Sequence, residues 1–189
     1  LEALSALITI GLRLERVSDQ ARNICMEVLY MCTGENPRHP EADVFRILFV
    51  DDSNSCRSQM AEAIAASMGL PNFIFASAGV DPAPVTPAMI AFMKDKGLDV
   101  SRATPKAIHQ VPNLDHYAVI VTLAPQAKKA FPRQPRKIIG LDWSVRDPSK
   151  ISGSPEEIRA AYEGAFEAIR SHVRNLVEAI LGTRLEDTK

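Results

Sequence analysis

The stretch Ile47-Leu48-Phe49-Val50-Asp51-Asp52-Ser53-Asn54-Ser55-Cys56-Arg57-Ser58 decides the fold class of this chain. Its first four residues are apolar and predict a buried β-strand, and the pattern from Ser58 to Met68 predicts a helix. A strand, a loop of small residues and a helix N-terminus together direct backbone N–H groups and the positive end of a helix dipole at one point. The stretch therefore predicts an anion-binding loop in an α/β protein.

The rest of the chain continues the alternation of strands and helices. Further strands are expected at Phe73–Ala76, Tyr117–Thr122 and 137–139, and the last helix at about Pro155–Leu181. Beyond the first 45 of the 189 residues, about 144 remain, which suits one domain with a single core. We expect a four-stranded parallel sheet flanked by helices, with the site at the carboxyl ends of the strands.

The loop and its flanks resemble the active-site loop of the low-molecular-weight protein tyrosine phosphatase and arsenate reductase family. The stretch Ala76-Ser77-Ala78-Gly79 and the helix start at Thr86-Pro87 resemble the same family. The family's loop has a Cys, five residues and an Arg, and the Cys is the nucleophile. Here Arg57 is in register, but Asp51 occupies the position of the nucleophile.

The resemblance implies roles for the residues of the loop. Arg57 offers a planar fork of donors that matches two oxygens of phosphate or arsenate. Asp147, in the pair Asp147-Pro148, matches the acid that protonates the leaving group. The implied catalytic set is Asp51, Arg57 and Asp147, and the implied oxyanion-binding set is Asp52, Ser53, Asn54, Ser55, Cys56, Arg57 and Ser58. Within it, Asn54 braces the loop and the Ser58 hydroxyl stabilises the family's thiolate.

Aspartate at position 51 weakens the case for catalysis. A carboxylate is a poorer nucleophile than a stabilised thiolate, and its negative charge competes with a bound dianion. Cys56 precedes Arg57 directly, so we expect it beside or behind the loop. Thioredoxin-coupled arsenate reductases of the family carry two more cysteines, where this chain has Ala124 and Phe131. An ordinary turn whose Ser and Asn cap the next helix is the alternative for the whole loop.

Residues 1–35 form a separate block with a heptad-like apolar stripe that predicts one long helix. The block resembles the last helix of PhoU, a regulator of phosphate uptake, and Glu15 and Asp19 occupy the positions of that family's metal motif. A solvated acidic edge is an equal alternative for this pair. Because the chain begins at Leu1 and the stripe is wide, we expect a larger bundle upstream, packing on the domain, or self-association. A linker at 36–45, the phosphatase-like domain at 46–182 and a tail at 183–189 complete the predicted organisation.

The composition excludes several classes of function. Twenty-two Lys and Arg against 23 Asp and Glu give a net charge of −1, which provides no basic field for nucleic acid. The apolar runs are too short for a membrane span. Three cysteines without disulfide-like spacing indicate the cytoplasm, and Cys25 and Cys32 are expected to pack in the interior.

These observations favour an oxyanion-binding domain with impaired catalysis, linked to the regulation of phosphate uptake. Its expected partners are phosphate, arsenate or a phosphorylated protein, and no cofactor is expected. An active phosphatase that uses Asp51 as nucleophile is the alternative. Reduction of arsenate with an external thiol is the third function considered. A purely structural role would leave Arg57, Ser58 and Asp147 without a function.

Overall fold

The computed structural model describes residues 44–131 and 138–182, together with six single positions nearer the N-terminus. The chain divides into two compact units, Leu1–Val44 and Phe45–Lys189. In the first unit the six single positions are helical and exposed: Val17, Ala21, Ile24, Cys25, Val28 and Met31. The expectation that Cys25 is buried is therefore wrong. Cys32, the predicted metal pair Glu15 and Asp19, and the predicted tail lie outside the described residues.

The second unit is built on a four-stranded parallel sheet in the order β2-β1-β3-β4. The strands are β1 (Phe45–Asp51), β2 (Phe73–Gly79), β3 (Val119–Thr122) and β4 (Ile139–Asp142). The predicted fold class is confirmed. The predicted fourth strand at 137–139 was placed too early, because the register pairs Ile139 to Asp142 with Val119 to Thr122.

Among the described residues of this unit, four α-helices alternate with the strands, namely α2 (Arg57–Ser67), α3 (Pro87–Asp95), α4 (Pro125–Lys129) and α5 (Pro155–Leu181). Thr86 caps α3 by accepting a hydrogen bond from the backbone N–H of Met89. Three short 3-10 turns, η1 (Ile108–Gln110), η2 (Leu114–His116) and η3 (Pro148–Lys150), lie in the connections.

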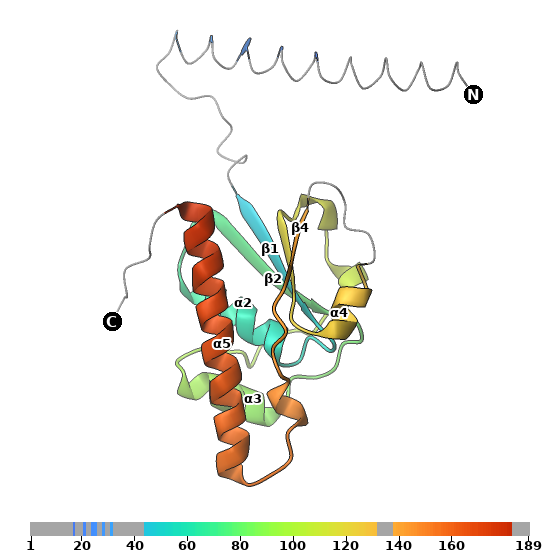
Figure 1. Cartoon of the computed structure of the whole chain (residues 1–189), viewed down its shortest axis with the longest axis vertical. Coiled ribbons are helices and arrows are strands. Elements are labelled where there is room, and N and C mark those ends of the chain that lie inside the picture. The colour runs from blue at the N-terminus through green and yellow to red at the C-terminus, as the bar shows by residue number, and fades with distance from the viewer. Residues whose placement is uncertain are drawn as a thin grey trace, which may run out of the picture. The chain divides into compact units, whose positions relative to one another are not determined.

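Helices cover both faces of the sheet. On one face α2, α3 and α5 pack on alternate sheet residues, with Phe49, Met60, Met89, Phe166 and Ile169 in the core. Figure 1 shows α5 running alongside α2 on this face. On the other face the neighbouring residues Leu48, Val50 and Ile120 pack against η1, η2 and α4. Since side chains alternate along a strand, the continuous apolar run of β1 is what a strand buried on both faces requires.

The strand order places the functional loop. The helices that follow β1 and β3 pack on opposite faces of the sheet. The carboxyl ends of these two central strands therefore form a topological switch point, where sheets of this kind commonly bind ligands. The loop from Asp51 to Arg57 begins at this point. In the part of the chain that the structure describes, no helix is both long and apolar enough to cross a membrane.

Candidate oxyanion-binding site

Asp51 ends β1 with its carboxylate turned into the loop that follows. Oδ1 accepts hydrogen bonds from the backbone N–H groups of Ser53 at 3.1 Å and Asn54 at 2.5 Å, and Oδ2 accepts one from Ser58 at 3.0 Å. The residue is 1% exposed. Burial raises the pKa of Asp51, while the N–H groups of Ser58 and Asn54 and the charge of Arg57 oppose that rise. The side chain thus acts as an internal anion for the loop.

Asn54 fixes the shape of the loop from its centre. It adopts φ 50°, the left-handed region that Asn tolerates better than most residues. Its Nδ2 donates to the hydroxyl oxygens of Ser58 at 2.9 Å and Ser77 at 2.8 Å, which ties the loop to the helix start and to β2. Its Oδ1 accepts from the backbone N–H of Lys106 at 2.8 Å and from Nε2 of Gln59 at 3.2 Å. All side-chain hydrogen-bonding capacity of Asn54 is therefore engaged in holding the loop.

The end of β2 supports the loop from the side. The backbone N–H groups of Val80, Asp81 and Ala83 donate to the carbonyls of Asp51, Asp52 and Ser53 at 3.2, 2.8 and 2.9 Å. Because its carbonyls are bound to the end of β2, the loop leaves its backbone N–H groups for contacts other than those with β2. This division is what an anion-binding loop needs.

Arg57 begins α2 and is buried across the site, with 4% of its side chain exposed. Nη1 donates to the carbonyls of Leu123 at 3.2 Å and Val145 at 3.0 Å. Nη2 forms ion pairs with Oδ2 of Asp52 at 3.1 Å and Oδ2 of Asp147 at 3.2 Å. Its Nε is buried and has no hydrogen-bond partner within the described residues. Two internal carboxylates therefore occupy one arm of the fork that was predicted to clamp an external anion.

Asp147 lies at this site, as its position in the Asp147-Pro148 pair predicts. Its carboxylate contacts cationic side chains there. Its Oδ1 accepts from the backbone N–H of Ser149 at 3.0 Å and from the Ser149 hydroxyl at 2.7 Å, which caps η3. Its Oδ2 is 3.6 Å from Nζ of Lys150, which also pairs with Asp52 at 3.2 Å. The carboxylate that the resemblance assigns as the acid is therefore in ionic contact with Arg57 and Lys150.

Part of the loop's binding capacity remains unused. The backbone N–H groups of Ser55, Cys56 and Arg57 make no hydrogen bond to any residue that the structure describes. Together with Nε of Arg57 they form a set of donors at the positive end of α2. An oxyanion that reaches this position would find these donors, and also the negative charges of Asp51 and Asp52.

Comparisons with known proteins identify the family. The family described as low molecular weight phosphotyrosine protein phosphatase matches residues 46–186. This chain belongs to that family. A glutaredoxin arsenate reductase of Synechocystis sp. is 32% identical over 136 residues, which is 72% of this chain and 95% of the relative. An arsenate reductase of Halalkalibacterium halodurans is 31% identical, over 70% of this chain and 94% of the relative.

Solved structures agree with the sequence relatives. An arsenate reductase in the phosphate binding state is 31% identical, with a TM-score of 0.57, and covers 72% of this chain and 98% of its own. The YwlE arginine phosphatase from Geobacillus stearothermophilus, at 24% identity and a TM-score of 0.58, shows the same fold. The PhoU-like character predicted for residues 1–35 has no counterpart among these findings.

Cys56 does not replace the missing nucleophile of the phosphatase family. It is 2% exposed, and its Sγ lies 4.0 Å from Sδ of Met89 in the core under α3. Burial and the nearby carboxylates of Asp147 and Asp51 raise the pKa of this thiol to about 12. It therefore stays protonated near neutral pH and is inert. Ala124 is fully buried before α4 and Phe131 is half-buried, and neither can resolve an arsenylated thiol.

The structure brings Asp51, Arg57 and Asp147 together with the whole predicted oxyanion loop. It also adds two residues that the sequence analysis did not single out. Lys150 contacts Asp52 and Asp147, and Ser77 contacts Asn54. Ser77 lies in the Ala76–Gly79 stretch that carried the resemblance, so its position beside the loop could have been suspected. No sequence signal marked Lys150.

Proposed function

We propose that the domain binds a phosphate-like oxyanion, or a phosphorylated partner, in the 51–58 loop with little turnover of its own. The hydrogen bonding of Asp51 carries this proposal. Both carboxylate oxygens accept loop N–H groups, and the side chain is buried. Electron pairs engaged in this way are poor nucleophiles, while the donors at Ser55, Cys56, Arg57 and Arg57 Nε remain for a ligand.

The wider setting of this proposal is the regulation of phosphate uptake in the cytoplasm. It is supported by the resemblance of residues 1–35 to the last helix of PhoU. The metal pair Glu15 and Asp19 belongs to that resemblance and carries no part of the oxyanion chemistry.

The relatives named arsenate reductases make arsenate a second oxyanion to consider. Arsenate shares the charge and tetrahedral shape of phosphate, so binding is expected for both. Reduction would take two electrons from thiols. The chain has only Cys25, Cys32 and Cys56, and Cys56 is a buried thiol with a raised pKa. We therefore expect arsenate to bind without being reduced.

An active phosphatase with Asp51 as nucleophile and Asp147 as acid remains the alternative, because Asp147 lies within the site. The ion pairs of Asp147 and the buried hydrogen bonds of Asp51 weigh against it. Hydrolysis of p-nitrophenyl phosphate distinguishes the two. We expect Asp51→Cys, alone and with Asp52→Asn, to exceed the native chain in rate by roughly 100-fold or more, since a thiolate replaces a hydrogen-bonded carboxylate. Equal, high rates in all three proteins would contradict the proposal.

Calorimetric titration of inorganic phosphate near pH 7 tests binding itself. The native chain should bind saturably, and Arg57→Ala should lose binding. Because Arg57 is buried, circular dichroism must show that the variant is folded. Arg146→Ala, a change at an exposed arginine next to Asp147, is the matched control and should bind as the native chain does. A folded native chain that does not bind phosphate would mean that its own carboxylates have closed the loop and that the domain is a scaffold.

A further inference from the structure

A pocket separate from the oxyanion loop lies between α2 and the segment that connects α3 to η1. Its volume is about 420 Å³, within the range of small-molecule sites. Small apolar side chains contribute part of the lining, and four charged side chains join them: Ala63, Ala66, Val100 and Ala103, with Glu62, Asp99, Arg102 and Lys106. The site described above shares none of these charged residues.

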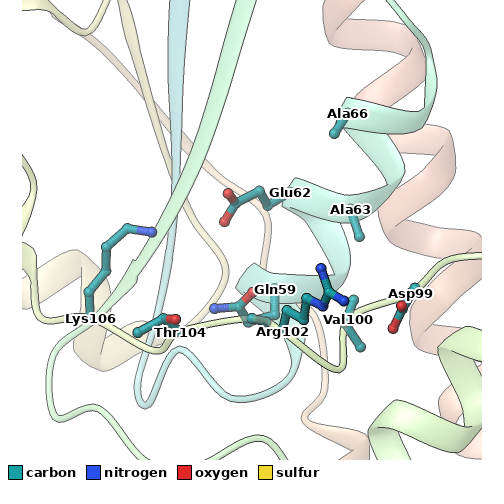
Figure 2. Close-up of a pocket in the computed structure, with 10 residues that line it drawn as sticks. Gln59, Glu62, Ala63, Ala66, Asp99, Val100, Arg102, Thr104 and Lys106 are labelled. Atoms are coloured by element: carbon teal, nitrogen blue, oxygen red, sulfur yellow. The ribbon is translucent and has the colours of Figure 1, made fainter.

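The four charges are balanced and not paired with one another. Two are acidic and two are basic, and in the described part of the chain none of them forms an ion pair. Figure 2 shows the Glu62 carboxylate and the Lys106 ammonium directed toward each other, with Asp99 on the opposite side from Lys106. A second phosphate-binding site is therefore disfavoured, because Glu62 and Asp99 would repel a dianion.

The carboxylates and the cations of the pocket differ in their hydrogen bonding. Glu62 accepts a hydrogen bond from the Ser77 hydroxyl, and Asp99 accepts one from the backbone N–H of Ser101 at 2.9 Å. Each carboxylate thus already accepts one hydrogen bond, from a residue of the pocket's surroundings. The side-chain nitrogens of Arg102 and Lys106 donate no hydrogen bond within the described residues, so their donors are free. The pocket offers acceptors and free donors around a small apolar wall.

This pocket is also connected to the oxyanion loop. Gln59 lines the pocket and donates from Nε2 to Oδ1 of Asn54, which also accepts the backbone N–H of Lys106. Glu62 reaches the same network through Ser77, whose hydroxyl accepts from Asn54. Three lining residues therefore lie one or two hydrogen bonds from the residue that holds the loop in its left-handed turn.

We propose that the pocket between Gln59, Glu62, Arg102 and Lys106 binds a small zwitterion, such as a free aliphatic amino acid or a dipeptide, and transmits its presence to Asn54. The carboxylate of the zwitterion contacts Arg102 and Lys106, and its ammonium contacts Glu62 or Asp99. The aliphatic part lies on Ala63, Ala66 and Val100. Binding at this pocket does not depend on the function proposed for the loop.

Amide chemical shifts of the full chain, titrated with L-leucine and with alanyl-leucine, test the proposal. We expect saturable shifts at Gln59, Ala63 and Lys106, and accompanying shifts at Asn54 and Ser58, with a dissociation constant of about 1 mM or tighter. Two analogues carry one charge each: 3-methylbutylamine lacks the carboxylate of leucine, and 4-methylpentanoate lacks its ammonium. Both should bind at least roughly ten-fold more weakly, since each loses one ionic contact.

Matched substitutions complete the test. Lys106→Gln and Glu62→Gln should each weaken the binding of leucine roughly ten-fold, because each removes one charge and keeps a polar side chain. Lys129→Gln, the same change at an exposed residue of α4, should leave the binding of leucine unaltered. The proposal is overturned if neither zwitterion gives saturable shifts, if 4-methylpentanoate binds as well as leucine, or if the shifts fall outside the pocket. Phosphate titration is separate, so failure here leaves the function of the loop unaffected.

Discussion

At the scale of single residues, the carboxylate at position 51 has a structural effect, seen in its contacts, and a chemical one that belongs to the proposed function. The Asp51 carboxylate binds the N–H groups of Ser53, Asn54 and Ser58 and so helps to order the loop. The same contacts engage both of its oxygens. In the function proposed above, this one side chain supports the shape of the loop and leaves it with little turnover.

Asp52 gives the first prediction at this scale. Its Oδ2 lies on Nη2 of Arg57, where an oxygen of the ligand would compete for the same donor. Asp52→Asn keeps the size of the side chain and removes its charge. We expect phosphate to bind the variant about ten-fold more tightly, which corresponds to about 1.4 kcal/mol. Calorimetry on the two proteins measures the change, and equal affinities would show that Asp52 does not compete with the ligand.

The raised pKa of Asp51 predicts a pH dependence of stability. The folded chain holds the proton of this carboxyl to higher pH than the unfolded chain does. The stability that this group contributes is therefore complete below its ordinary pKa of 3.8 and is lost as the pH rises through the folded value. The variant Asp51→Ser lacks this titrating group. We therefore expect the unfolding free energy of the variant, minus that of the native chain, to rise with pH from about 4 upward. The rise should be at most about 1.4 kcal/mol per pH unit.

Denaturant unfolding of both proteins at a series of pH values measures this difference. Other titrating groups are shared by the two proteins, so their contributions cancel in the subtraction. A difference that falls as the pH rises would mean that the hydrogen bonds from Ser58 and Asn54 outweigh the burial of the carboxylate.

At the scale of elements, the contact between the end of β2 and the loop is the tightest constraint on the site. A Cβ at Gly79 would lie 2.5 Å from the backbone nitrogen of Asn54 and 2.7 Å from the carbonyl carbon of Ser53. These are backbone atoms, so relieving the clash would require the loop itself to shift. We expect Gly79→Ala to cost about 1–3 kcal/mol of unfolding free energy and to weaken phosphate binding.

Gly164 provides the control for this substitution. It lies in α5, and a Cβ there would meet no atom within 4 Å. Gly164→Ala should therefore stabilise the chain by about 0.5–1 kcal/mol, because alanine favours a helix more than glycine does. Thermal or denaturant unfolding measures both variants. If Gly79→Ala proved as harmless as Gly164→Ala, the loop would be more adaptable than its contacts indicate.

Elements were predictable from sequence where local chemistry determines them. The helix predicted at about Pro155–Leu181 has those bounds, because Ser154 and Glu157 form a capping box at its start and Gly182 ends it at φ 68°. The fourth strand was misplaced because its limits depend on pairing with β3. The contacts of Arg57 with the carbonyls of Leu123 and Val145 were also missed, because no local pattern records such contacts across the fold.

At the scale of the whole molecule, self-association through the N-terminal unit remains a prediction. Val17, Ile24 and Met31 are seven residues apart, and they are 60%, 64% and 72% exposed. This heptad spacing is typical of a helix that pairs with another helix. We expect the weight-average mass of the chain to rise with concentration toward that of a dimer, and Ile24→Asp to abolish the rise.

Light scattering over a range of concentrations measures this effect. Ile139→Asp, the same change at an isoleucine of β4 that is 61% exposed, should behave as the native chain does. A native chain that keeps the mass of one protomer at high concentration would contradict the prediction.

The internal carboxylates also affect the order of the loop when no ligand is bound. A loop that depends on its ligand for order would be poorly formed when phosphate is scarce. Here Asp51 and Asp52 supply negative charge from within the chain, and Asn54 and Gly79 hold the backbone in place. In the function proposed above, the loop would therefore be formed before any phosphate binds, and no energy of binding would be spent on ordering it.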